Sequence, residues 1–486
     1  MSVPRTIRGA RGAASTAHPD ATRAALGMLD VGGSAVDAAI AAQAVIAVVM
    51  PHAAGLGGDL LALVRTPAGA VVAVNGVGRS PALAPSTWGS DGGSSVTVPG
   101  LVDGWFALHA RGGRLPLPLV LEPAMRLAVG HVVDEQLAAA VEKQRARLER
   151  YGRAPTALLQ AEPGVLRRQP ELAALLDRIG SVGPEAFYRG SAAAAIVSAV
   201  AATGGTLSDA DLAAHRTSTP EPLGVPWYGG KLVVQPPPSQ GVLLAMAAAW
   251  LDRRDPDPSV PLQHLLVELV ESVYEYREKV TSRGADLLRA RLYPDLVHAS
   301  RRGGARAYLH TAGVAVADVD GTVVSSLISV FDDFGSAVFV PELGIVLANR
   351  AAGFTTGANA PGTSRYPVHT LAPAMVLAAD GGATGLATPG ADGQIQTLLQ
   401  ILAAVRFTGC SFAEALDRPR WRSEDGRLLI EAGHEAGPVL ATRGHDLVTR
   451  SPGNAVFGAV VVAGVDATGP FAAGDRRRDV RAGGTP

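Results

Sequence analysis

The stretch from Tyr308 to Phe354 reads YLHTAGVAVADVDGTVVSSLISVFDDFGSAVFVPELGIVLANRAAGF. Turn signals separate three apolar runs within it: 314–317, 323–330 and 338–347. Asp318 to Gly321, between the first two runs, places Asp and Gly where a tight hairpin needs them. The second run is rich in β-branched residues, which favour strands. We therefore expect adjacent antiparallel strands in the middle of a buried sheet, the first of which begins at Thr311.

Thr311 by itself would be only a β-branched residue at the head of a strand, but its neighbours indicate more. From Thr311 to Gly321 the chain reads TAGVAVADVDG. This resembles T-[TA]-H-[FYL]-S-V-V-D-x-D-G, the pattern that opens the small subunit of the gamma-glutamyltranspeptidase family, with Gly313 in place of the His. Eighteen residues further on (329 − 311), Ser329 stands where the family has a hydroxyl that hydrogen-bonds the nucleophile. The following F-G-[ST] is present as Phe334-Gly335-Ser336.

The resemblance implies an N-terminal-nucleophile (Ntn) hydrolase, whose precursor cuts itself before a threonine. That threonine then serves as nucleophile and, through its new amine, as base. A threonine hydroxyl is a poor nucleophile without an adjacent base. An α-amino group has a pKa of about 7.7–8.0, against about 10.4 for Lys, so it can be neutral at working pH without deep burial. Cleavage between His310 and Thr311 would therefore supply both groups in one residue.

Family patterns recur along nearly the whole chain. The matching segments are 14–39, 51–58, 98–105, 187–190, 204–212, 236–241, 365–373, 388–392, 417–421 and 474–477. The resemblance implies an α+β fold, the Ntn-hydrolase αββα four-layer sandwich, in which helices cover both faces of two central, largely antiparallel sheets. Residues 1–310 would form the large (α) subunit segment and residues 311–486 the small (β) subunit segment, intertwined in one domain.

The resemblance also implies an oxyanion hole. Thr388 to Asp392 reads TPGAD, where the family has S-P-G-G, whose backbone N–H groups hold the oxyanion. Gly390 and Ala391 are therefore the expected donors. Because backbone donors need no particular side chain, alanine fits the second position, but only if its φ is negative. His369 and Thr370 stand in place of the Ser pair in the family pattern K-R-P-x-S-S-M-x-P.

The residues that would hold a glutamyl group are replaced. The family pattern N-N-[QE]-x-x-D-F becomes ANRAAGF at 348–354, with Arg350 for the Gln/Glu and Gly353 for the Asp that holds the glutamyl ammonium. Phe331 replaces an Asn that also helps there. A cation where an ammonium should dock is repulsive, so we infer that the α-amino-acid end of a glutamyl group is not the substrate. Arg350 could instead bind a carboxylate by bidentate hydrogen bonds.

A second departure from the family concerns the pattern D-F-R-E-T-[AS]-P, whose arginine binds the substrate α-carboxylate. Here Val77 occupies the arginine position and Arg79 lies two residues on, where it either reaches an acidic group or anchors the loop. These features resemble the acylase-like branch of the family, which is similar to cephalosporin (glutaryl) acylases. Members of this superfamily in natural-product pathways also cleave unusual acyl groups, including by carbon–carbon hydrolysis.

The amino-acid composition limits the structures and partners that the chain can have. The chain has 486 residues, 47% of them hydrophobic, and a net charge of −1, which provides for a large core and argues against nucleic acid as a partner. Its single cysteine, Cys410, excludes an internal disulfide. We expect a cytoplasmic protein without membrane association, because neither a secretory signal nor an unbroken run of about eighteen apolar residues is present. No Cys/His cluster has ligand spacing, so no metal or cofactor is expected.

The expected function is a self-processing amidase or acyltransferase, an αβ heterodimer made from one precursor. Its substrate would be a small-molecule or peptide-like amide with an acidic acyl group. The acyl group, the acceptor and any further oligomerisation stay open. One alternative is true gamma-glutamyl transfer, including glutathione hydrolysis, with an altered pocket. Another is an inactive scaffold that binds a ligand without chemistry, which the missing His at Gly313 and the altered Gly-Gly pair keep open.

Overall fold

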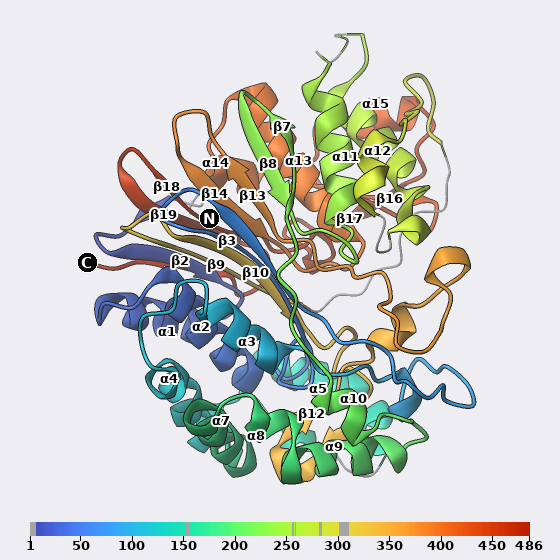
Figure 1. Ribbon diagram of the computed structural model, residues 1–486. Coiled ribbons are helices and arrows are strands. Elements are labelled where there is room, and N and C mark those ends of the chain that lie inside the picture. Colours follow the sequence, from blue (N-terminus) through green and yellow to red (C-terminus); the bar gives the residue numbers. More distant parts are fainter. Residues whose placement is uncertain (1–5, 152–155, 255–256, 258, 281–283, 301–310) are drawn as a thin grey trace.

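The computed structural model describes residues 6–151, 156–254, 257, 259–280, 284–300 and 311–486. In this part of the chain two antiparallel sheets occupy the centre of the molecule (Figure 1). The strands of one are β2 (Gly12–Thr16), β3 (Asp59–Arg65), β4 (Val71–Gly76), β9 (Ala312–Asp318), β10 (Val323–Ser329) and β20 (Arg481–Gly484). The strands of the other are β1 (Ile7–Arg8), β7 (Leu223–Trp227), β8 (Gly230–Val234), β13 (Ala374–Leu377), β14 (Ala383–Ala387), β18 (Val461–Asp466) and β19 (Gly469–Gly474).

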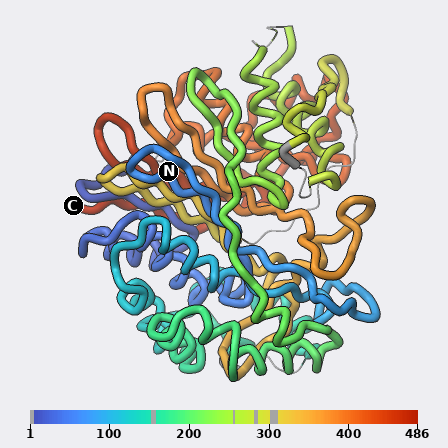
Figure 2. The backbone as a smooth tube through the Cα atoms, viewed as in Figure 1, coloured from blue at the N-terminus to red at the C-terminus, as the bar shows by residue number. Residues whose placement is uncertain are grey.

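The order of strands interleaves the two halves of the chain. The six-stranded sheet runs β20-β2-β9-β10-β3-β4 and the seven-stranded sheet runs β1-β19-β18-β14-β13-β8-β7. In the first sheet, β9 and β10 from beyond residue 311 lie between β2 and β3 from before it. The backbone trace shows the same mixing, with the blue and yellow segments side by side and both chain ends on one side of the molecule (Figure 2). Each sheet thus contains strands from both halves of the chain.

Small apolar residues fill the space between the two sheets. β9 contributes Ala315 and Ala317 and β10 contributes Leu327, while Met375 and Val461 come from the facing sheet. Side chains two positions apart on a strand share a face, so the alternate residues of β9 and β10 point the other way, toward helices. This alternation makes the six-stranded sheet apolar on both faces and requires a layer on each.

Helices form the two outer layers (Figure 1). α1 (Pro19–Asp30) and α2 (Ala35–Val49) share a hydrophobic core with the outer face of the six-stranded sheet. α11 (Gly241–Asp252), α12 (Leu262–Tyr274) and α13 (Gly393–Thr408) share another with the seven-stranded sheet. α2 is buried along its whole length and begins with a capping box, because Ser34 and Asp37 hydrogen-bond each other's backbone N–H. The expected αββα four-layer sandwich is confirmed.

The remaining helices and strands are additions to the four-layer sandwich. The other helices are α3 (Leu101–His109), α4 (Leu117–Val129), α5 (Glu135–Glu149), α6 (Thr156–Leu159), α7 (Pro170–Val182), α8 (Glu185–Tyr188), α9 (Gly190–Ala201), α10 (Asp209–Ala213), α14 (Phe412–Asp417) and α15 (Gly437–Thr442). Small sheets pair β5 (His131–Val132) with β6 (Leu166–Arg167), β11 (Phe339–Val340) with β12 (Ile345–Val346), and β15 (Trp421–Glu424) with β16 (Arg427–Glu431) and β17 (Leu447–Arg450). None of the helices among the described residues is both long and apolar enough to cross a membrane.

One expectation about the opening stretch is wrong. The first two runs form β9 and β10, which are adjacent, antiparallel and central, as expected. The third run does not join them: it forms the separate β11–β12 pair. The cause lies in residues 331–337, where Phe331, Phe334, Gly335 and Ala337 all have positive φ and turn the chain out of the sheet.

A buried ion-pair cluster joins two segments that the sequence marks as motifs. Asp475, after β19, accepts from Arg420 at 2.6 Å and from Arg477 at 3.0 Å, and Arg477 also pairs with Glu431 at 2.5 Å. All four side chains are at most 1% exposed. Because buried charges are costly when a partner is lost, this cluster fixes the C-terminal segment against the 417–421 segment.

Replacing Asp475 by alanine leaves two buried guanidinium groups without this partner. We expect the variant to lose about 3–5 kcal/mol of unfolding free energy, visible as a lower urea midpoint by tryptophan fluorescence. The matched control is Asp466→Ala, on the same hairpin, because Asp466 and its partner Arg8 are 37% and 43% exposed. That change should cost less than about 1 kcal/mol. Equal losses in the two variants would contradict the assignment.

Candidate active site

Thr311, Ser329 and Asp59 form one row across three neighbouring strands. β9 pairs with β10 through Ala312 and Ile328, so the next position places Thr311 opposite Ser329. Ser329 in turn pairs with Asp59 at the start of β3. The Thr311 hydroxyl donates a hydrogen bond to Ser329 Oγ at 3.1 Å. All three residues are buried, with Thr311 6% exposed. The hairpin register thus supplies the contact that the eighteen-residue spacing predicted.

This row faces the space between the sheets. Ala315 and Leu327, which lie on the same strand faces as Thr311 and Ser329, belong to the core between the sheets. On that face Gly313 leaves no room for a side chain, since a Cβ would lie 2.9 Å from a methyl of Val461 and 3.6 Å from the carbonyl oxygen of Ala387. The packing at this position therefore suits a glycine, which is the residue that replaces the family's His. The same contact places the head of β9 beside the end of β14.

The chain leaves β14 through Gly390 and Ala391 and enters α13 at Gly393. Gly390 has φ 129° and Ala391 has φ 49°. Among the described residues, neither N–H donates to a partner, while the Ala391 carbonyl accepts from the Gln240 side chain at 3.0 Å and from Gln394 N–H at 3.1 Å. Both peptides precede a helix N-terminus, where anions are stabilised. Two N–H groups beside the end of β14 suit an oxyanion.

The positive φ of Ala391 corrects the expectation that an alanine there needs a negative φ. The left-handed conformation costs a residue with a Cβ roughly 1–2 kcal/mol. Two hydrogen bonds to the Ala391 carbonyl, from Gln240 and Gln394, hold the peptide in this orientation. Such backbone strain is found where the surrounding structure over-determines a conformation. The alanine therefore adopts a left-handed conformation that glycine would adopt without this cost.

Asp59 gathers the residues that replace the glutamyl site. Its Oδ2 accepts from Arg350 Nε at 3.0 Å and from His369 Nε2 at 3.1 Å, and the Arg350 guanidinium lies 4.3 Å from the centre of the Phe331 ring. Burial alone would raise the pKa of Asp59, but the hydrogen bond from His369 and the charge of Arg350 hold it below the ordinary value. The carboxylate is therefore ionised and shared between two donors.

His369 is neutral. Burial, followed by the Arg350 charge, lowers its pKa to about 4 against the pull of Asp59. The ring also has a defined tautomer, because Leu371 N–H donates to Nδ1 at 3.2 Å and the proton must then lie on Nε2, facing Asp59. The 236–241 loop fixes this segment: Gln240 N–H donates to the His369 carbonyl and its side chain to the carbonyl of Thr370, which is buried.

Arg350 and Arg79 differ in their access to a ligand. Arg350 is 0% exposed and engages Asp59, so the structure gives it an internal partner in place of the substrate carboxylate suggested by the sequence. Arg79 is exposed, with its guanidinium 5.0 Å from the ring centre of Tyr366. It follows Gly78, whose N–H lies 3.4 Å from Asp59 Oδ1. Arg79 therefore lies on the outer rim of the site. His310 lies outside the described residues.

Sequence reasoning missed two residues of this site. Asp59 follows the Gly-rich 51–58 segment directly and opens an otherwise apolar strand, LLALV. A lone carboxylate at the head of a buried strand was the signal, because buried acids need partners. Gln240, which holds both Thr370 and Ala391, follows the Pro-rich turn and carried no comparable signal.

These features define the class of the protein: an αββα sandwich with the fold of an Ntn hydrolase. The chain belongs to the gamma-glutamyltranspeptidase family, whose model matches residues 21–485. It is 32% identical to the oxamate amidohydrolase proenzyme of Klebsiella pneumoniae over 84% of each chain. It is 31% identical to the acylase ACY 1 proenzyme of a Pseudomonas species, over 91% of this chain and 88% of that one.

The solved structure of cephalosporin acylase from Bacillus halodurans supports the same assignment. It superposes with a TM-score of 0.86 at 27% identity and covers 100% of this chain and 98% of its own. The family resemblance and the fold expected from sequence are confirmed. The chain is thus a gamma-glutamyltransferase-like Ntn hydrolase, an enzyme of amide hydrolysis or acyl transfer.

The lowered pKa of His369 makes stability depend on pH. The unfolded imidazole titrates near 6.5 and the folded one near 4, so the unfolded chain binds more protons between these values and stability falls as pH decreases. His369 should contribute a loss of about 2 kcal/mol between pH 7 and pH 5. Urea unfolding at the two pH values should show this loss reduced in His369→Gln. His298→Gln, at an exposed histidine, should keep the wild-type difference. An unchanged difference in His369→Gln would refute the buried neutral state.

Proposed function

We propose that this enzyme is a self-processing N-terminal-threonine amidohydrolase or acyltransferase, acting on amide-linked acyl groups other than gamma-glutamyl. The observation that carries the proposal is the 3.1 Å hydrogen bond from the Thr311 hydroxyl to Ser329 at the head of β9. Both relatives described above carry the name proenzyme, which supports processing of a precursor. Residues 1–310 and 311–486 are then the two subunits of an αβ heterodimer.

Processing begins with Thr311. Its hydroxyl oxygen attacks the carbonyl carbon of residue 310, the C–N bond breaks as an ester forms, and the hydroxyl proton passes to the freed amine. Water hydrolyses the ester, leaving a carboxylate on residue 310 and a free amine and hydroxyl on Thr311. The residue now carries its own base, as the threonine variant of the nucleophile–base pair requires.

The catalytic cycle uses the same atoms. The Thr311 amine takes the hydroxyl proton as Oγ attacks the substrate amide carbon, and the N–H groups of Gly390 and Ala391 stabilise the oxyanion. One such donor is typically worth 10²–10³ in rate. The leaving amine takes the proton, and water or a second amine releases the acyl group from the ester. Ser329 holds Oγ in place throughout.

The substrate pocket favours an acidic acyl group without a glutamyl ammonium. Arg350 and Phe331 replace polar residues of the family pattern that hold that ammonium, and the Arg350 guanidinium lies over the Phe331 ring and pairs with Asp59. Asp59 shares its charge between Arg350 and His369. The exposed Arg79 offers a cation at the rim. Similarity to an oxamate amidohydrolase, named for an amide that carries a carboxylate, agrees with a small acidic substrate.

The mass of the purified chain under denaturing conditions tests processing. The chain of 49.7 kDa should give two fragments that meet between residues 310 and 311 and together exceed the precursor by one water. Thr311→Ser keeps the hydroxyl and should still be cut, whereas Thr311→Ala should stay whole. An uncut wild-type chain, or cutting of the alanine variant at the same bond, would overturn the proposal. Efficient hydrolysis of glutathione by the cut enzyme would instead favour gamma-glutamyl transfer.

Arg79→Met tests the acidic preference. Exposed charge interactions are worth up to about 1 kcal/mol, so KM for an amide with an acidic acyl chain should rise up to about fivefold, with kcat unchanged. KM for the matching neutral amide should not change. Arg23→Met, at an exposed arginine on α1, is the control and should leave both values as they are. Equal effects of Arg79→Met on acidic and neutral amides would remove Arg79 from substrate recognition.

A further inference from the structure

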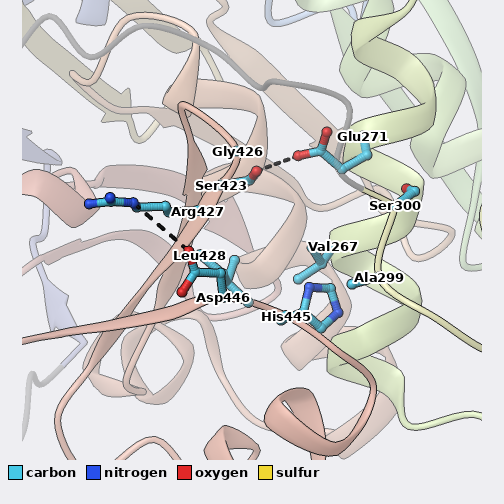
Figure 3. A pocket seen from close by; sticks show the side chains of 10 residues that line it. All are labelled: Val267, Glu271, Ala299, Ser300, Ser423, Gly426, Arg427, Leu428, His445 and Asp446. Carbon is cyan, nitrogen blue, oxygen red and sulfur yellow. Dashed lines mark hydrogen bonds and ion pairs between the residues drawn. The ribbon is translucent and has the colours of Figure 1, made fainter.

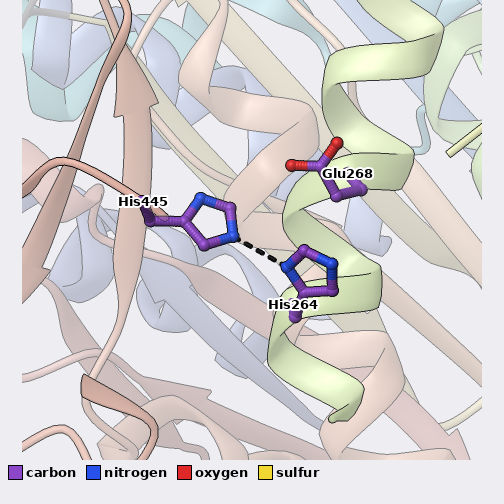
Figure 4. Close-up of side chains that lie close together, drawn as sticks. All are labelled: His264, Glu268 and His445. Carbon is purple, nitrogen blue, oxygen red and sulfur yellow. Dashed lines mark hydrogen bonds between the residues drawn. The ribbon is translucent and has the colours of Figure 1, made fainter. Parts of the chain in front are cut away.

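Two histidines and a glutamate lie close together where α12 faces the loop that precedes β17. His264 and Glu268 lie one turn apart on α12, so both project from one face of the helix (Figure 4). His445 reaches them from the loop between α15 and β17. One ligand atom from each residue lies within 4.8 Å of the other two. His264 and Glu268 are 0% exposed. Three metal-binding side chains therefore converge in a largely buried place.

The imidazole rings are close to the separation that a shared ion requires. His264 Nδ1 and His445 Nε2 are 2.8 Å apart. Two nitrogens at about 2.0–2.1 Å from a tetrahedral zinc ion are about 3.3 Å apart, so the rings need to separate by only about half an ångström.

The carboxylate of Glu268 is held from outside the cluster. Ser300 N–H donates to Oε1 at 3.0 Å and the Ser300 hydroxyl donates to Oε2. These two bonds orient the Glu268 carboxylate beside the two rings. Metal-binding carboxylates are commonly hydrogen-bonded in this way by residues that do not themselves touch the ion.

A small cavity of about 20 Å³ adjoins the cluster. Its lining includes His445 and Ser300, together with Val267, Glu271 and Ser423 (Figure 3). A space of this size admits one water molecule. Three protein ligands with a water in the fourth position form a common zinc coordination sphere.

We propose that His264, Glu268 and His445 bind one divalent transition-metal ion, for which zinc is the best match to two imidazole nitrogens and one carboxylate oxygen. The ion joins α12, the loop before β17 and, through Glu268, Ser300. Ser300 lies eleven residues before Thr311 (311 − 300). The ion therefore fixes Ser300 to α12, at a place separate from Asp59 and Ser329. The competing interpretation is a plain hydrogen bond between the two rings.

The test uses the full-length chain without a histidine tag, freed of metal by a chelator. Titration with ZnCl2 in a calorimeter should show one tight equivalent, and CoCl2 should give the visible absorption bands of a tetrahedral ion. His445→Ala should weaken zinc binding by at least about 100-fold, and Ser300→Ala by about 10–100-fold. Glu268→Gln removes the charge at constant shape and should also weaken it. His298→Ala, at an exposed histidine two residues before Ser300, is the control and should bind as the wild type does.

Circular dichroism of each metal-free variant confirms that it is folded before titration. Absence of a tight site in the wild type, or equal affinity in the wild type and in both His445→Ala and Glu268→Gln, would overturn the proposal and leave the ring-to-ring hydrogen bond. Zinc binding is measured independently of chain cleavage. A chain that binds zinc but stays uncut would therefore contradict the proposed function alone, and a cut chain without a zinc site would contradict this inference alone.

Discussion

The site depends on one buried negative charge. Asp59 begins a strand whose next five residues are apolar, and its carboxylate binds Arg350 and His369 at 3.0 and 3.1 Å. Removing a carboxylate from water is costly unless charged or hydrogen-bonding partners compensate, so these three residues are interdependent. Because Asp59 is also the strand neighbour of Ser329, the charge lies directly beside the pair formed by Ser329 and Thr311. Arg350, the cation at this place, is thereby paired inside the protein.

The parts of the fold that follow from local rules could be predicted from sequence. The β9–β10 hairpin follows from its Asp-Gly turn and its apolar, β-branched runs, and its register brings Thr311 to Ser329. α2 follows from its Ser34 cap and apolar composition. The third apolar run was misplaced because several positive φ angles over residues 331–337 redirect the chain, and alanine and phenylalanine give no warning of that conformation.

The missed parts of the site depend on long-range contacts. Asp59 meets Arg350 across 291 positions and His369 across 310, and no periodicity in the sequence reports such pairs. The same holds for His264 and His445, which are 181 positions apart, so a search for closely spaced ligands could not find them. Arg350 was assigned a substrate role from its place in the family pattern and from its charge. Its burial, which only the folded chain shows, gives it a structural one.

The interleaved strand order determines whether the chain folds before or after it is cut. β9 and β10 lie between β2 and β3, and β14 and β18 lie between β8 and β1. A separate 311–486 polypeptide would begin with two strands whose outer edges have no neighbours, and a separate 1–310 polypeptide would lack the middle of both sheets. Unpaired edges of apolar strands promote aggregation. Neither piece is a folding unit, so any cut before Thr311 is made in a chain that has already folded, and the pair that results is assembled before it is separated.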